Sequence, residues 1–115
     1  MTPYRRAILE LGTGNDLHGG DYTKAALRAV QDALHHSSLA FLRALSIPAA
    51  EMRVAVTIGV QRPEAVDAER VKASLPYGQI TVQVVKGGLD VPDPGGKDPA
   101  VIASAALAVS IPVGG

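Results

Sequence analysis

Asp16 and His18 stand two positions apart in a segment, residues 12–21, that also holds four glycines. In an extended backbone, residues two apart point to the same side, so the two side chains fit a general acid–base pair or two ligands of a metal ion. The spacing equally fits a structural role, in which Asp16 accepts hydrogen bonds from loop amides and His18 bonds a backbone carbonyl. Spacing alone leaves all three interpretations open, and acid–base catalysis is the one we carry forward as the functional hypothesis.

The glycines of this segment and two cations supply the second group of candidates. Glycine permits close backbone approach, and amides beside a helix N-terminus bind carboxylate or phosphate. The segment lacks the third glycine of a dinucleotide fingerprint and the Gly-Lys-Ser/Thr ending of a P-loop, so no cofactor is expected. Two cations at the ends of later strands suit an anionic substrate, although solvated charges fit those places as well. The expected substrate-binding residues are Gly12, Gly14, Gly19, Arg62 and Lys86.

Alternation of apolar and polar residues predicts three strands, at residues 7–11, 52–59 and 79–86. In the first strand, Leu9 and Leu11 are expected to face the core. The opposite, mixed face would meet solvent or, since its polar side chains are short, a neighbouring subunit. The residues expected on that mixed face are Glu10, Thr57, Thr81 and Gln83.

Helical spacing predicts a helix that begins at about Tyr22 and extends toward residue 45, with a bend or break at Ser37-Ser38. A second helix is expected over 65–74. A third, apolar on nearly all sides, is expected over 100–108, and residues 109–113 would add a short edge strand. The expected N-caps of the first and third helices are Asp21 and Asp98, the latter followed by Pro99 in the first turn, and Asp67 is a rival N-cap inside the second helix.

Each expected strand has one apolar and one mixed face, whereas strands covered on both sides are usually apolar on both. We therefore expect an α+β fold, a two-layer α/β sandwich with a small mixed or parallel sheet and helices on one face. Strands joined by helical crossovers tend to be parallel, so the segments that follow them should meet at one end of the sheet, where ligands usually bind. The polar residues expected there are Asp16, His18, Asp21, Arg62, Lys86, Asp90, Asp93 and Lys97.

The composition narrows the class of protein. The 115 residues fit a single domain, 1–115. Basic and acidic residues number 11 each, which argues against nucleic acid as a partner. The longest nearly apolar stretch, 100–111, is too short to span a membrane, so we expect a cytoplasmic protein. Cysteine is absent, and with only 3% aromatic residues the core is built from small aliphatic side chains; such a thin core favours a homo-oligomer.

Residues 12–19 match the pattern GxGxDxHG, which resembles the signature of a family of short conserved hypothetical proteins from bacteria and plants whose function is unknown. The fixed positions are Gly12, Gly14, Asp16, His18 and Gly19. The resemblance extends, more loosely, over nearly the whole chain, and it implies a site without implying a substrate. The order of elements also resembles the bacterial chorismate-mutase type of fold and its trimeric relatives, in which clefts form between subunits; a likeness of fold does not transfer function.

Two functions from different classes follow, and the sequence leaves open whether the chain is an enzyme. In the first, a homo-oligomeric enzyme acts on a small polar anionic metabolite by hydrolysis, ring opening or isomerisation. His18 is its acid or base, oriented by Asp16, and Arg62 or Lys86 holds the anionic group with the loop amides. In the second, the chain is a non-catalytic oligomeric protein for ligand binding or assembly, and Asp16 and His18 are structural.

Overall fold

A computed structural model describes residues 3–35, 46–76 and 78–113 of the chain. Within these residues there are five strands and two α-helices. In chain order the elements are β1 (Tyr4–Asp16), α1 (Tyr22–His35), η1 (Ala49–Glu51), β2 (Arg53–Val60), η2 (Pro63–Ala65), α3 (Ala68–Ala73), β3 (Gln79–Lys86), β4 (Leu89–Val91) and β5 (Ala100–Pro112), where η1 and η2 are single 3-10 turns.

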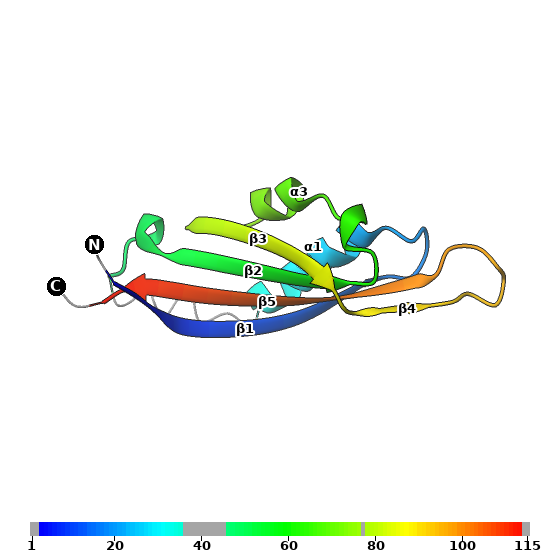
Figure 1. The fold of residues 1–115 in the computed structure, drawn as a ribbon, viewed down its shortest axis with the longest axis horizontal. Coiled ribbons are helices and arrows are strands. Elements are labelled where there is room, and N and C mark those ends of the chain that lie inside the picture. Colours follow the sequence, from blue (N-terminus) through cyan, green and yellow to red (C-terminus); the bar gives the residue numbers. More distant parts are fainter. Residues whose placement is uncertain (1–2, 36–45, 77, 114–115) are drawn as a thin grey trace.

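The five strands form one mixed sheet in the order β1-β5-β2-β3, and β4 pairs with the first residues of β5. β5 runs antiparallel to both β1 and β2, while β2 and β3 are parallel to each other. β1, β2 and β3 therefore run in one direction and end at the same end of the sheet, on the right in Figure 1. The expected meeting of the segments that follow these three strands is confirmed.

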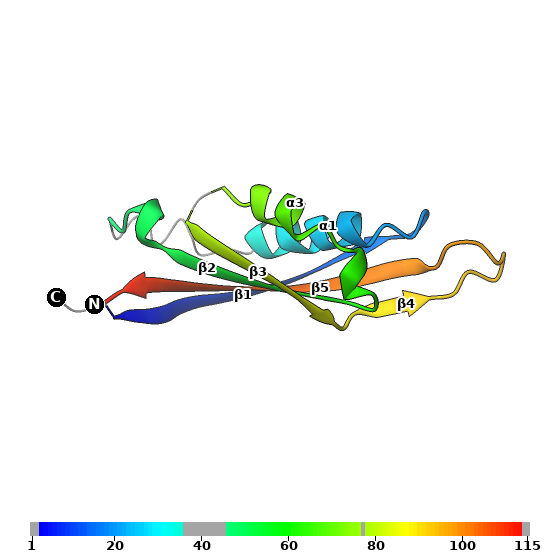
Figure 2. The ribbon, with the colours of Figure 1, turned by 45° about the horizontal axis from the view of Figure 1, so that its top comes forward.

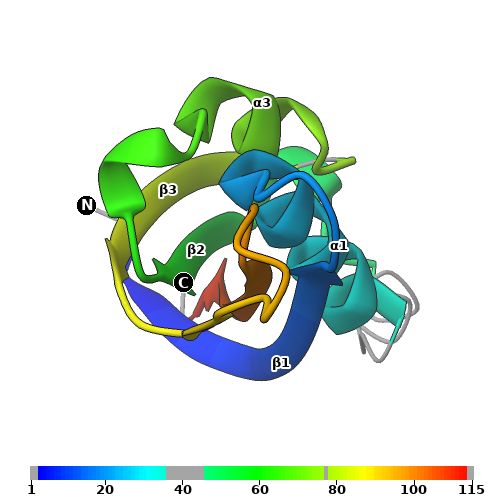
Figure 3. The same cartoon turned by 90° about the vertical axis from the view of Figure 1, so that its right-hand side faces the viewer.

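α1 and α3 lie on the same face of the sheet and leave the other face uncovered (Figures 2 and 3). We call the uncovered face the open face. The core lies between the two layers, where Ala29 of α1, Val56 of β2 and Leu107 of β5 are almost completely buried. The predicted two-layer sandwich with helices on one face is confirmed.

The first two predicted helices are present. Asp21 caps the first, and Asp67, the rival N-cap, caps the second. α1 begins at Tyr22, and the Asp21 carboxylate accepts a hydrogen bond from the N–H of Lys24 at 3.0 Å. The expected continuation of this helix through Ser37-Ser38 falls on residues 36–45, outside the described part of the chain. The second helix is shorter than predicted. η2 comes first, and α3 then begins after Asp67. The Asp67 carboxylate accepts a hydrogen bond from the N–H of Arg70, as is usual for an N-cap.

The helix predicted over 100–108 is wrong, and so are the N-cap role of Asp98 and the edge position of residues 109–113. This segment is β5, a long strand in the middle of the sheet between β1 and β2. Its inward side chains, such as Val101 and Leu107, are buried, and most of its outward ones are small. Because small or apolar residues occupy both faces, the segment shows no alternation that would distinguish a strand from a buried helix.

The predicted orientation of the first strand is also wrong. β1 continues through Gly12 to Asp16, so most of the expected glycine-rich loop is strand. Gly12 faces the helices, and Glu10, two residues earlier, faces the same way and is half-buried. Leu9 and Leu11 lie on the open face and are 47% and 63% exposed. At positions 12 and 14 the inward residue is glycine, because α1 approaches the strand too closely there for a side chain.

Candidate functional site

Gly12 and Gly14 face α1, and the helix backbone lies directly on them. A Cβ built on Gly12 would come within 2.4 Å of the carbonyl oxygen of Ala29, and one on Gly14 within 2.2 Å of the amide nitrogen of the same residue. Ala25, Ala29 and Ala33 supply matching small side chains at every fourth position of the helix. These two glycines therefore serve the packing of helix on sheet, since any side chain would push α1 away.

The amides of these glycines are directed into the sheet. The N–H of Thr13 points out of the free edge of β1 and donates to Oδ2 of Asp32 on α1, at 2.9 Å. Successive N–H groups of a strand point to opposite edges, so those of Gly12 and Gly14 point toward β5. The contacts of the two glycines are thus packing and sheet contacts, and their role in substrate binding stays a prediction.

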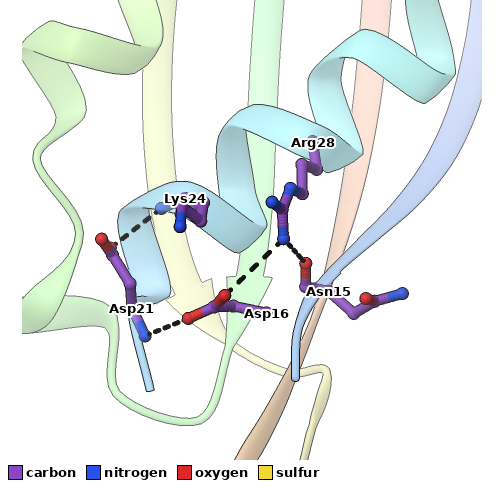
Figure 4. Close-up of polar contacts among 5 residues, drawn as sticks. All are labelled: Asn15, Asp16, Asp21, Lys24 and Arg28. Carbon is purple, nitrogen blue, oxygen red and sulfur yellow. Dashed lines mark hydrogen bonds and ion pairs between the residues drawn. The ribbon is translucent and has the colours of Figure 1, made fainter. Parts of the chain in front are cut away.

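Asp16 ends β1 and joins it to the first turns of α1 (Figure 4). Its side chain is buried, and Oδ2 accepts a hydrogen bond from the backbone N–H of Asp21 at 2.9 Å. Oδ1 lies 3.6 Å from a guanidinium nitrogen of Arg28, and the same nitrogen donates to the carbonyl oxygen of Asn15 at 2.7 Å. Both carboxylate oxygens therefore have partners, and the side chain connects strand, turn and helix.

His18 and Gly19 lie in the turn between β1 and α1. Gly19 and Gly20 have φ angles of +96° and +59°, a backbone region that glycine adopts without strain. His18 is exposed and has no hydrogen-bond or ion-pair partner in the part of the chain that the structure describes. Asp16 and His18 are therefore close in sequence without a hydrogen bond between them here, and their action as an acid–base pair stays a prediction.

A polar cluster lies at the same end of the sheet. The hydroxyl of Tyr22, at the start of α1, donates to Oδ2 of Asp90 in β4, and Oδ1 of Asp90 is buried without a partner among the described residues. The hydrogen bond to Asp90, followed by burial and the negative charge of that carboxylate, raises the pKa of Tyr22, while the nearby Arg62 opposes the rise. Arg62 itself pairs with Glu64 at 3.3 Å, and both side chains are largely exposed. We name these four residues the Tyr22 cluster.

A groove of about 580 Å³ crosses the open face, and this volume is within the range of small-molecule sites. Most of its lining is glycine, alanine or aliphatic, and Lys86, at the end of β3, is its one cationic residue among the described lining residues. Nε2 of Gln61 donates to the carbonyl oxygens of Gly87 and Gly88, at 3.0 and 3.2 Å, and so holds the turn beside Lys86. The other lining residues with polar side chains are Thr13, Asp32, Thr57 and Ser104.

The predicted site residues therefore do not form a single site. Two of them line the groove, Gly12 and Lys86. The others lie under α1, in the turn before it, or after β2; these are Gly14, Asp16, His18, Gly19 and Arg62. Sequence reasoning does not find Tyr22 or Ser104. A buried tyrosine hydroxyl usually has a partner, which is a signal for Tyr22, but Ser104 lies in the segment wrongly predicted as a helix.

No three His, Asp or Glu side chains within residues 3–35, 46–76 and 78–113 are placed to hold a metal ion together. Asp16 and His18 would therefore lack a third protein ligand from that part of the chain. Over the same residues, no helix has the length and apolar character needed to cross a membrane.

Comparison with known proteins identifies relatives without an assigned function. Residues 6–109 match the family described as conserved hypothetical protein (Lin0512_fam). Among solved structures, the chain is similar to an FtsZ-like protein of unknown function from Nostoc punctiforme, with 35% sequence identity and a TM-score of 0.83 over 98% of this chain and 100% of that chain. No curated protein matches. The chain belongs to the Lin0512 family of conserved hypothetical proteins.

Proposed function

We propose that this protein binds a small anionic molecule with an apolar body in the groove of the open face. The observation that carries the proposal is Lys86, which lines the groove and has no ion-pair partner among the residues described. A lysine in the lining of a mainly apolar groove suits a ligand with a carboxylate or a phosphate. The Nostoc punctiforme protein is itself described as of unknown function, so it contributes no ligand to this proposal.

The two sides of the groove differ in charge. Lys86 ends β3, whereas Asp32 reaches the groove beside β1, and two strands separate β1 from β3, which corresponds to about 14 Å. Asp32 accepts the N–H of Thr13, and its negative charge disfavours a second anion nearby. The anionic group of the ligand is therefore expected at Lys86.

The floor between these two sides suits an apolar body with a few polar substituents. Leu11 and Val85 offer aliphatic contact, and the hydroxyls of Thr57 and Ser104 can each donate or accept one hydrogen bond. The ligand class is therefore a monoanion with an apolar part rather than a free inorganic ion.

Calorimetric titration with three probes tests this ligand class. Benzoate carries an anion and an apolar ring, inorganic phosphate carries only the anion, and benzyl alcohol only the ring. We expect benzoate to bind most tightly, and Lys86→Met to weaken it by about tenfold or more. The matched control is Lys72→Met, which removes an exposed lysine from α3 in the other layer and should leave the affinity unchanged. Equal affinities of benzoate for the wild type and Lys86→Met would contradict the proposal.

Acid–base catalysis by His18 is a second candidate function, favoured by one observation. The exposed His18 lies in the turn that leads to Tyr22, at the end of the sheet where the Tyr22 cluster gathers polar groups. Hydrolysis, ring opening or isomerisation of a small anionic metabolite would use an imidazole in this position. The two carboxylate oxygens of Asp16 already have partners in the N–H of Asp21 and the guanidinium of Arg28. His18 would therefore act without a hydrogen bond to Asp16.

Screening a panel of small esters, lactones and isomerisable carboxylates tests this second candidate. Any turnover found with the wild-type chain should disappear in His18→Ala and persist in His35→Ala, which removes an exposed histidine at the end of α1. Full turnover in a folded His18→Ala variant would eliminate His18 as the acid or base.

A further inference from the structure

The open face carries large apolar side chains that nothing in the described chain covers. Leu9 and Leu11 of β1, and Leu89 and Val91 of β4, are between 47% and 63% exposed. All four pair with residues of β5 that point away from the helices, and paired residues of neighbouring strands share a face. They therefore lie on the same surface as the groove.

Charge is almost absent from the centre of the open face. β5, the middle strand, has no charged residue along its whole length. On β2 and β3, the only charged residues are the terminal ones, Arg53 and Lys86, and the outward residues between these ends are small or uncharged, such as Thr57 and Gln83. Sheet faces that meet water carry charged side chains, whereas the cores of protein interfaces are depleted of them.

The accessible surface of the chain is larger than that of a typical monomer of the same mass. The excess is close to the area that one partner buries in an ordinary protein–protein interface. The surface is 6727 Å² for a mass of 11.9 kDa. A monomer of that mass exposes about 5,950 Å², so the excess is about 780 Å². One partner in a standard interface buries about 800 Å². The molecule is also elongated, 59 × 24 × 19 Å, which leaves one long side of the sheet to be covered.

We infer that a second copy of this chain packs on the open face and forms the roof of the groove. The exposed leucines, the uncharged centre of the open face and the excess accessible surface all favour self-association. The roof rests in addition on the proposed function, in which the groove holds a ligand. The described lining of the groove comes from one sheet, the turn after β3 and Asp32. Such a groove covers a ligand from below, while small-molecule sites enclose most of the ligand. A site at Lys86 is incomplete until the second copy covers it.

Analytical ultracentrifugation of the full chain tests the self-association. At micromolar concentration the wild type should sediment at twice its monomer mass or a higher multiple. Leu11→Glu and Gln83→Lys each place a charge on the open face and should raise the dissociation constant by about tenfold or more. Two variants are used because Leu11→Glu alone could fail by unfolding. The matched control is Leu17→Glu, at a leucine that is 58% exposed in the turn after β1, and it should associate like the wild type.

Benzoate titration of the same variants separates this inference from the proposed function. Gln83 does not line the groove among the residues described, so Gln83→Lys should weaken benzoate binding only through loss of the second copy. Lys86→Met should lose benzoate and keep the wild-type assembly. A wild-type monomer at high micromolar concentration overturns the self-association. Unchanged benzoate affinity in a monomeric Gln83→Lys variant overturns the roof and leaves the groove itself intact.

Discussion

Gly14 lies directly beneath Ala29, with room between them for a hydrogen atom and not for a methyl group. A Cβ on Gly14 would be 2.2 Å from the amide nitrogen of Ala29 and 2.5 Å from the carbonyl oxygen of Ala25. These are backbone atoms of a helix, which cannot move aside as the end of a side chain can. The glycines of the motif therefore set the distance between α1 and β1, and this distance brings Asp16 to Arg28.

Gly14→Ala should lower the free energy of unfolding by about 3 kcal/mol or more, because the added methyl group forces α1 off the sheet. The measurement is urea unfolding followed by circular dichroism, with the free energy extrapolated to water. Gly12→Ala, whose Cβ would come within 2.4 Å of the backbone of both Ala29 and Ala33, should behave in the same way.

Gly95→Ala is the matched control for these two variants. Gly95 lies between β4 and β5, and the atoms nearest to a Cβ there belong to the carboxylate of Asp93, the closest at 3.3 Å. Its replacement should change the free energy of unfolding by no more than about 0.5 kcal/mol. If Gly14→Ala were as stable as Gly95→Ala, the packing role of the motif would be refuted.

Sequence prediction succeeds where the two faces of a strand differ in polarity and fails where they do not. Residues 79–86 were predicted with the bounds of β3, because its half-buried valines alternate with polar residues. Periodicity does not identify β5 as a strand, since Ala106 and Ala108 on its outer face are apolar like its buried inner residues. In β1, a periodicity argument counts Leu9 and Leu11 as the core face, whereas Glu10, Gly12 and Gly14 face the helices and contribute no apolar signal.

The candidate site was predictable to the extent that strand ends define it. Lys86 follows a clear strand, so its place at the end of the sheet could be inferred from sequence, and it lines the groove. The contact between Tyr22 and Asp90 joins residues 68 positions apart, and local spacing carries no information on such a pair. Ser104 reaches the groove through β5, whose strand character is invisible to periodicity.

Asp16→Ala should lower the free energy of unfolding by about 1–3 kcal/mol, since it leaves the N–H of Asp21 without its acceptor and removes the carboxylate from Arg28. Arg28→Ala should have a smaller effect, up to about 1 kcal/mol, because its side chain is half-exposed and water replaces the lost contacts. Thermal and urea unfolding of the two single variants and the double variant give the coupling between them. An Asp16→Ala variant as stable as the wild type would show that Asp16 does not hold the turn.

Asp32→Ala should lower the free energy of unfolding by about 0.5–1.5 kcal/mol, because it removes the acceptor of the Thr13 N–H at the free edge of β1. An edge strand with uncapped N–H groups is also a template for pairing with another chain. We therefore expect faster aggregation on heating, measured by light scattering. The control is Asp93→Ala, which removes an acceptor from a turn outside the sheet core and should leave the aggregation rate unchanged.

The stability provided by Tyr22 should depend on pH in the alkaline range. Its hydroxyl donates to Asp90, and this bond raises the pKa of Tyr22 above the ordinary value of 10.0. A pKa raised by folding means that the neutral tyrosine stabilises the fold. That contribution is complete below pH 10.0 and declines as the pH rises through the pKa of the folded protein, because the unfolded chain ionises first.

Tyr22→Phe isolates this contribution. At neutral pH the variant should be less stable than the wild type by about 1.5–3 kcal/mol, since the partly buried carboxylate of Asp90 loses its donor. In unfolding experiments from neutral pH to about pH 11, the difference between wild type and variant should stay constant up to pH 10.0 and shrink above it. Tyr4→Phe is the control, because the Tyr4 ring stacks under Arg53 and its hydroxyl has no hydrogen bond within the described residues. A difference for Tyr22→Phe that stays constant across the alkaline range would mean that the hydroxyl of Tyr22 ionises alike in the folded and unfolded chains, and that its bond to Asp90 does not stabilise the fold.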